Sequence, residues 1–429
     1  MFRKSTRPAR RFGSHVALAF ALAADGMVGS ALVSTPALAQ KKKEEAKGKP
    51  VNSKAFAAAY TPLADAVNSG TDYAAAKAMV PGVVAAIEND HDKFIMGNLL
   101  VSLGDKSKDI SLQEQGIQLM LDSGETPSER VGMFHYYLGK WAMDAKNFAK
   151  ARTEFQASAA AGYPEGDPEV ILAETYFGEK NYAEGLRYLA NLIDKRSAAG
   201  QEIPDAWLNR GLAVAYEAKL ADQGNDYASR LLAQSPSNDN WLRAFTVVAT
   251  LNKFDDQGQL DLLRLMMLTD ALKERYQYQE YLNTTTKLGL PSEALSVLNY
   301  GVKTNAFAAS DPLYTTTKSA IDPLIARDAK DIPNLAKDAQ GAATGRNANG
   351  AGNAFYSLGR YAEAEAMFKL ALEKGGVDND MVRTRLGMAQ IQQGKLAEGK
   401  ATLEQVNGTR VPVADMWIAY ADSKTAAGG

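Results

Sequence analysis

The chain has 429 residues, a formal net charge of −2, and 46% hydrophobic and 23% charged residues, a composition typical of ordered proteins. It contains no cysteine and only three histidines, which excludes disulfides, thiol nucleophiles and cysteine-ligated zinc or iron–sulfur sites. Because positive and negative charges nearly balance, the composition also argues against nucleic acid as a partner.

The first 39 residues have the pattern of a secretory signal peptide. Residues 2–11 hold five basic side chains and no acidic one, residues 16–24 are apolar, and Ala37-Leu38-Ala39 forms a small-residue cleavage motif. We expect cleavage after Ala39 and a periplasmic or secreted product with no stable transmembrane anchor, because about 20 apolar residues are needed to span a bilayer. An uncleaved N-terminal anchor is the main alternative.

Residues 40–51 form a charged segment with five lysines. The segment has too few apolar side chains to fold by burying them, so we interpret it as a linker. It would act either as a solvated spacer or as an electrostatic tether to an anionic membrane surface.

A pattern of about 34 residues repeats through the chain after residue 130. In its clearest copy, residues 352–372, two helical patterns meet at Gly359, and glycine is the residue that most readily adopts the left-handed conformation that ends a helix. The second pattern places apolar or small residues on one helix face, namely Tyr361, Ala364, Phe368, Ala371 and Leu372. Related copies have their anchor residues near positions 148, 182, 220, 254, 291 and 396.

These copies resemble the tetratricopeptide repeat (TPR) family, with a large residue, a Leu-Gly pair, an aromatic residue after the turn, and then small and aromatic residues at helical spacing. The resemblance covers residues 131–425. It implies an all-α fold, a TPR-type helix-turn-helix solenoid with a right-handed superhelical twist, in which each repeat packs only against its neighbours. Asp261 and Arg264 depart from the pattern, because they occupy positions where the repeat has apolar or small residues.

The pattern divides the remainder of the chain into four parts. Residues 52–130 form an N-terminal helical region that holds candidate degenerate repeats, and residues 131–310 form a TPR array. Residues 345–429 form a C-terminal TPR pair with a capping helix around Trp417.

The fourth part, residues 311–344, is interrupted by proline and glycine. Asp311-Pro312 and Asp322-Pro323 have the residues of helix starts, and Ile332-Pro333 predicts a further break. We interpret this segment as a hinge between two arrays or as irregular, packed short helices.

No catalytic motif, metal-binding motif or cofactor fingerprint is present, so we predict no enzymatic activity, no metal and no cofactor. His91 and His135 each lack a second histidine at ligand spacing, and His135 occupies a position used for packing between helices. We assign the nearby tyrosines Tyr276, Tyr278 and Tyr281 to helix packing, with stacking on a base or a sugar as the alternative.

The TPR resemblance implies a concave groove, lined by the first helix of each repeat, that binds a partner protein or peptide. Asn353 matches one position of the carboxylate clamp in chaperone-binding TPR proteins, but Asn349 replaces the lysine of that clamp, so we do not assign that activity. The family's groove positions correspond here to Tyr136, Lys140, Glu174, Phe177, Leu208, Leu212, Tyr216, Arg346, Asn349, Asn353 and Tyr356.

The sequence therefore predicts an exported scaffold for protein–protein interaction in a bacterial envelope or secretion process. An alternative is recognition or processing of a glycan or peptide in the same groove. A third is a structural role through self-association.

Overall fold

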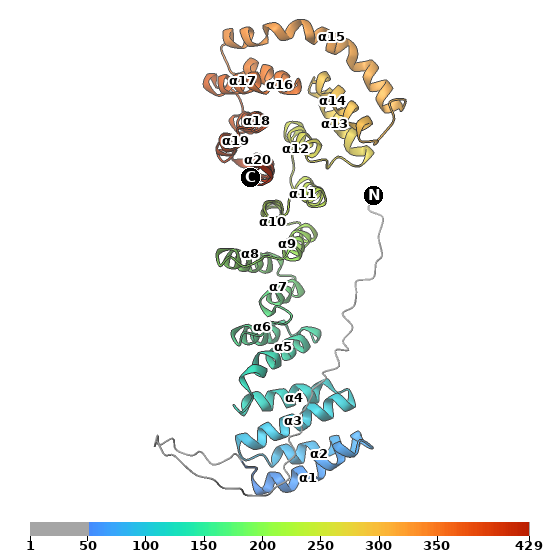
Figure 1. The fold of residues 1–429 in the computed structure, drawn as a ribbon, viewed down its shortest axis with the longest axis vertical. Helices are drawn as coiled ribbons and strands as arrows, with labels where there is room; N and C mark the ends of the chain where they lie inside the picture. Colours follow the sequence, from blue (N-terminus) through green and yellow to red (C-terminus); the bar gives the residue numbers. More distant parts are fainter. Residues whose placement is uncertain (1–50, 429) are drawn as a thin grey trace, which may run out of the picture. The chain divides into compact units, whose positions relative to one another are not determined.

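The computed structural model describes residues 51–428, which contain twenty α-helices, one short 3-10 helix and no strand (Figure 1). This confirms the predicted all-α fold of TPR-type helical hairpins. The predicted signal peptide, and all of the predicted linker except Val51, lie outside the described residues. The chain forms two compact units, and the first ends at Gly178. This division falls inside residues 131–310, which the sequence pattern treats as one array.

In the described part of the first unit, residues 51–178, there are seven helices, and consecutive helices pack as antiparallel pairs. The helices α3 and α4 approach closely at Gly97 and Gly116, which have no side chains to keep the two backbones apart. A Cβ atom added at Gly97 would lie only 2.6 Å from the carbonyl oxygen of Gly116. The residues predicted as a degenerate N-terminal region therefore form true helical hairpins. The helices are α1 (Lys54–Ser69), α2 (Tyr73–Ala85), α3 (Asp90–Ser107), α4 (Ile110–Asp122), α5 (Ser128–Asp144), α6 (Phe148–Ala160) and α7 (Pro168–Gly178).

The second unit holds the remaining helices. They are α8 (Tyr182–Ala198), α9 (Asp205–Ala218), α10 (Ala221–Gln234), α11 (Asn238–Leu251), α12 (Asp256–Leu268), α13 (Arg275–Lys287), α14 (Pro291–Lys303), α15 (Pro312–Gly341), α16 (Arg346–Ser357), α17 (Tyr361–Lys374), α18 (Asn379–Gln392), α19 (Leu396–Leu403), the 3-10 helix η1 (Gly408–Arg410) and α20 (Val411–Gly428).

A packing contact inside the hairpins accounts for the small residues of the repeat. A glycine in the first helix faces a large side chain sixteen residues later in the second helix. A Cβ atom added at Gly139 would lie 2.9 Å from the ring of Phe155, and one added at Gly352 would lie 2.6 Å from the ring of Phe368. The pairs Gly211–Tyr227 and Gly387–Leu403 repeat this contact.

The segment predicted as interrupted is instead one helix of 30 residues, α15. Asp311 begins it as predicted, since its carboxylate accepts a hydrogen bond from the Leu313 amide at 2.8 Å. The breaks predicted at Pro323 and Pro333 do not occur. Both prolines are exposed, and so are Ser319 and Ala329, whose carbonyls lose their intrahelical donors. Water can hydrate these carbonyls, which is why the helix continues.

The second unit does not follow the expected rule that repeats pack only against sequence neighbours. After α13–α17, the chain returns so that α18 contacts α12, and α20 contacts both α10 and α12 (Figure 1). The last helix therefore packs against the middle of the unit, and Trp417 of α20 is fully buried there.

Candidate functional site

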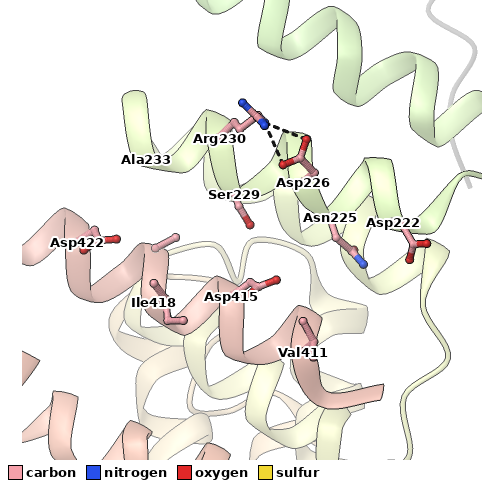
Figure 2. Close-up of a pocket in the computed structure, with 11 residues that line it drawn as sticks. Asp222, Asn225, Asp226, Ser229, Arg230, Ala233, Val411, Asp415, Ile418 and Asp422 are labelled. Carbon is pink, nitrogen blue, oxygen red and sulfur yellow. Dashed lines mark hydrogen bonds and ion pairs between the residues drawn. The ribbon is translucent and has the colours of Figure 1, made fainter. Parts of the chain in front are cut away.

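Two hollows in the second unit are candidate functional sites. One lies between α10 and α20, and we call it the acidic groove (Figure 2). The other is lined by residues of α12–α18, and we call it the inner cavity.

The acidic groove has a volume of about 620 Å³ and carries four carboxylates. Figure 2 shows Ser229 of α10 and Asp415 of α20 pointing into the space between the two helices. Val411 and Ile418 add apolar surface on the α20 side. The lining residues are Asp222, Asn225, Asp226, Ser229, Arg230, Ala233, Val411, Asp415, Ile418, Ala419 and Asp422.

The cations near this groove are already paired. Arg230 donates from Nε to both carboxylate oxygens of Asp226, at 2.9 and 2.8 Å, and its guanidinium also contacts Asp194. Hydrogen bonding to Asp194, and then to Asp226, raises the pKa of Arg230 above its usual value. Asp422 forms an ion pair with Lys400.

Two carboxylates of the groove, Asp222 and Asp415, make no ion pair or side-chain hydrogen bond with any described residue. Burial, and then the charge of Asp226, raises the pKa of Asp415 above its usual value. A cation placed in the groove would relieve this cost of keeping Asp415 ionised.

A neighbouring hollow of about 470 Å³ between α8 and α10 shares Asp222 and Asp226 with the acidic groove. The acidic side of α10 therefore borders two hollows, and a ligand longer than one side chain has continuous surface to follow.

The inner cavity has a volume of about 440 Å³. Its lining is mixed, with aliphatic side chains, three tyrosines, three serines, one glutamine and the Arg264–Glu293 ion pair. The lining residues are Arg264, Met267, Leu268, Tyr281, Ser292, Glu293, Leu295, Ser296, Ile325, Tyr356, Ser357, Leu358, Gly359, Tyr361 and Gln392.

Behind the inner cavity lies a buried ionic cluster formed by Asp261, Arg264, Glu293, Arg385 and Arg410. Asp261 is fully buried and accepts hydrogen bonds from Arg264 at 3.0 Å, from Arg385 at 3.2 Å and from Arg410 at 2.6 Å. Glu293 accepts two hydrogen bonds from Arg264, at 2.8 and 2.7 Å.

Electrostatics keep Asp261 ionised in this environment. Burial alone would raise the pKa of Asp261, but the charges of Arg385, Arg410 and Arg264 outweigh it and hold the pKa below its usual value. The indole nitrogen of Trp417 also donates to the Asp261 carbonyl at 3.0 Å. The cluster thus connects α12 to α18, η1 and α20.

Part of these sites is visible in the sequence pattern, and the rest is not. Asp261 and Arg264 depart from the repeat, and they are the centre of the cluster. Nothing in the sequence marked Arg385 and Arg410 as their partners. The four-residue spacing of Asp222 and Asp226, which places both on one helix face, is the sequence signal of the acidic groove.

In the first unit, the four predicted groove residues lie on α5 and α7. Tyr136 is half-buried in an aromatic cluster with Tyr137, Phe155 and Tyr163, at ring-centroid distances of 5.4–6.0 Å. Lys140 and Glu174 are partly exposed, whereas Phe177 is only 6% exposed and belongs to the core.

In the second unit, Leu208 and Leu212 are 1% and 3% exposed, so these predicted groove residues pack in the core of α9. Tyr216 is half-buried. The other four lie on one face of α16, where Arg346 is exposed, Asn349 and Asn353 are partly buried, and Tyr356 lines the inner cavity. The predicted groove positions therefore fall on α5, α7, α9 and α16, and some of their side chains lie in the core, not at the surface.

Both described histidines have carboxylate partners. His91 Nδ1 lies 2.8 Å from Glu125, and His135 Nδ1 lies 2.8 Å from Glu154. Within residues 51–428, no group of three or more acidic or histidine side chains is arranged to hold a metal ion. None of the described helices is long and apolar enough to cross a membrane.

No family model and no curated protein matches the chain. Three solved structures show distant similarity. The TPR2AB-domain:pHSP90 complex of yeast Sti1 is 14% identical, with 68% of this chain and 98% of the other covered, at a TM-score of 0.25. A tetratricopeptide repeat protein from Parabacteroides merdae is 10% identical, with 67% and 98% covered, at a TM-score of 0.26. A structure of Naa15/Naa10 bound to HypK-THB is 13% identical, with 86% and 65% covered, at a TM-score of 0.33.

Proposed function

We propose that this protein is a non-catalytic interaction scaffold that binds a lysine- or arginine-rich segment of a partner protein in the acidic groove. The observation that carries the proposal is the pair of carboxylates, Asp222 and Asp415, that line the groove without a cation. Asp415 is partly buried, so an opposite charge would offset its cost of desolvation, and Asp222, which is exposed, adds a second negative charge at the rim of the groove.

The shape of the groove supports an extended basic segment. Lysine and arginine bury their aliphatic stems on apolar surface and keep the charged end at a carboxylate. Val411 and Ile418 provide that surface beside Asp415. The continuation past Asp222 and Asp226 between α8 and α10 allows a second basic side chain to bind.

The direct test measures binding of a fluorescein-labelled peptide of alternating lysine and serine to the purified chain by fluorescence anisotropy. We expect binding that weakens as salt increases, and at least a tenfold loss of affinity in the double variant Asp222→Asn/Asp415→Asn, since each charged contact contributes about 1–2 kcal/mol.

The matched control is Asp338→Asn, an exposed aspartate of α15 outside the groove, which should bind like the original chain. A peptide of alternating glutamate and serine should not bind. Equal binding of the lysine peptide by the double variant and the control would refute the assignment of this groove.

We also propose that the protein is exported and acts in a bacterial envelope or secretion process. The support is the pattern of residues 1–39, which lie outside the described residues. Mass spectrometry of the protein recovered from the periplasm of an expressing bacterium should find Gln40 at the N-terminus. Recovery only from the cytoplasm with residues 1–39 intact would contradict the proposal.

A further inference from the structure

The inner cavity contains polar groups that no part of the described chain satisfies. The hydroxyl of Tyr356, which lines the cavity, makes no hydrogen bond with any described residue and is accessible from the cavity. The Nε2 atom of Gln392, which also lines the cavity, is buried without a partner. Buried polar groups in proteins are almost always hydrogen-bonded, so the unpaired amide of Gln392, beside the unpaired and accessible hydroxyl of Tyr356, points to a polar ligand in this cavity.

The charges that line the cavity exclude a charged ligand. Arg264 is held by Glu293 and Asp261, and the hydroxyl of Tyr281 donates to Glu293 at 2.8 Å. The cavity therefore has no free cation for an anionic ligand and no free carboxylate for a cationic one. An ionised ligand would lose its hydration without gaining a counter-charge, which is strongly unfavourable.

The remaining lining favours a ligand with both apolar and hydroxyl-bearing faces. Tyr361 is half-buried, and its ring lies 5.1 Å from that of Tyr356 in an edge-on arrangement. Leu295 of α14 and Ile325 of α15 add apolar surface, and the hydroxyl of Ser292 makes no hydrogen bond with any described residue. Aromatic and aliphatic surface beside unpaired donors and acceptors is suited to a pyranose ring, which has an apolar C–H face and a rim of hydroxyls.

We infer that the inner cavity binds an uncharged sugar unit, with Tyr361 against the ring and with Tyr356 and Gln392 hydrogen-bonded to its hydroxyls. The long helix α15 contributes Ile325 to the lining of this cavity. The site is separate from the acidic groove and goes beyond the proposed scaffold role.

The experiment uses saturation-transfer NMR and calorimetry on the purified chain with cellobiose, maltose, lactose and N,N′-diacetylchitobiose. At least one of these neutral disaccharides should bind. We expect Tyr356→Phe, which removes only the hydroxyl and keeps the ring against Arg264, to weaken binding about fivefold to tenfold. Gln392→Leu should have a similar effect, and Tyr361→Ala a larger one.

Two control variants distinguish an effect at the inner cavity from an effect of substitution elsewhere in the unit. Tyr314→Phe removes a hydroxyl from α15 that bonds Asn299 outside the cavity, and it should leave sugar binding unchanged. The acidic-groove variant Asp222→Asn/Asp415→Asn should also leave it unchanged, so the two sites are tested independently. Circular dichroism should match among all the variants.

Three outcomes would overturn the inference. The first is that no member of the panel binds at millimolar concentration. The second is that Tyr356→Phe and Gln392→Leu bind as tightly as the original chain. The third is that glucuronate binds as tightly as the neutral sugars, since this would contradict the compensated charges of the cavity.

Discussion

The two units of the chain each bury an aspartate completely, but they satisfy it in different ways. In the first unit, Asp92 accepts hydrogen bonds from the backbone amides of Ser53 and Glu88, at 2.9 and 3.0 Å. In the second unit, Asp261 is surrounded by three guanidinium groups, of which Arg385 and Arg410 are 124 and 149 residues away in sequence.

This difference shows two ways of building a unit from the same helical hairpins. Asp92 joins the start of α1 to the start of α3 through two backbone amides, of which that of Ser53 is 39 residues away in sequence. Asp261 connects helices that are far apart in sequence, so the second unit closes on itself. A buried carboxylate is thus satisfied by backbone amides across 39 residues in one case and by guanidinium groups across 124 and 149 residues in the other.

The largest expected effect follows from removing the centre of the buried ionic cluster. Asp261→Ala leaves Arg385 buried without a counter-charge and leaves Arg410 with only the longer 3.6 Å contact to Asp255, and we expect the second unit to lose about 3–5 kcal/mol of unfolding free energy. Urea unfolding followed by limited proteolysis should show that the second unit is digested first while the first unit stays protected. A loss below about 1 kcal/mol would mean that the cluster does not hold the unit closed.

Both units contain the packing contact between a glycine of the first helix and a large side chain of the second, and substitution of the glycine tests it. Gly139→Ala in the first unit and Gly352→Ala in the second place a methyl group against Phe155 and Phe368, and each should cost about 1–3 kcal/mol. The matched controls are Gly82→Ala and Gly350→Ala, which have open space around the added methyl and should stabilise by about 0.5–1 kcal/mol. Thermal unfolding measures all four, and equal behaviour of test and control variants would refute the packing contact.

A smaller effect is expected for the buried aspartate of the first unit. Asp92→Ala leaves the amides of Ser53 and Glu88 without their acceptor, and we expect a loss of about 1–2 kcal/mol, confined to the first unit. Hydrogen exchange should increase at those amides and at α1. If this variant destabilised as much as Asp261→Ala, the contrast between satisfaction by backbone amides and satisfaction by guanidinium groups would fail.

The smallest effect is a pH dependence in the second unit. Burial alone would raise the pKa of Glu365, but hydrogen bonds from Lys369, Lys395 and Gln393 lower it to about 2. A depressed carboxyl pKa stabilises the folded state above about pH 4.3, the usual value in the unfolded chain, and this contribution disappears as the pH falls towards 2.

Glu365→Gln should therefore cost about 1 kcal/mol at pH 7, since both lysines are largely exposed to solvent, and almost nothing at pH 2. Unfolding curves at several pH values measure this. A constant difference between the two proteins across that range would contradict the assigned role of the carboxylate.

The local features of the molecule follow the sequence pattern. Gly359 has a φ of 72° at the turn where a left-handed glycine was expected, and Asp311 begins a helix as expected. Tyr361 begins α17, and Phe368 on its apolar face is fully buried. These features depend on helix caps and on a period of 3.6 residues, which are properties of short stretches of chain.

The candidate sites were predicted only in part. Tyr356 was named and lies in the inner cavity, but Leu208 and Leu212 were named and lie in the core. Repeat positions identify a helix and its approximate face, whereas small rotations of the packed helix decide which side chains reach the surface.

By itself, the sequence determined the all-α class, the hairpin repeat and the glycine positions, because backbone conformation and amphipathic periodicity are encoded within a few turns of helix. Only the tertiary structure decided that Asp261 meets Arg385 and Arg410, that α15 continues through its prolines, and that α10 and α20 form a groove. A buried charge is stable only beside its partner, and packing, not spacing in the sequence, brings these partners together.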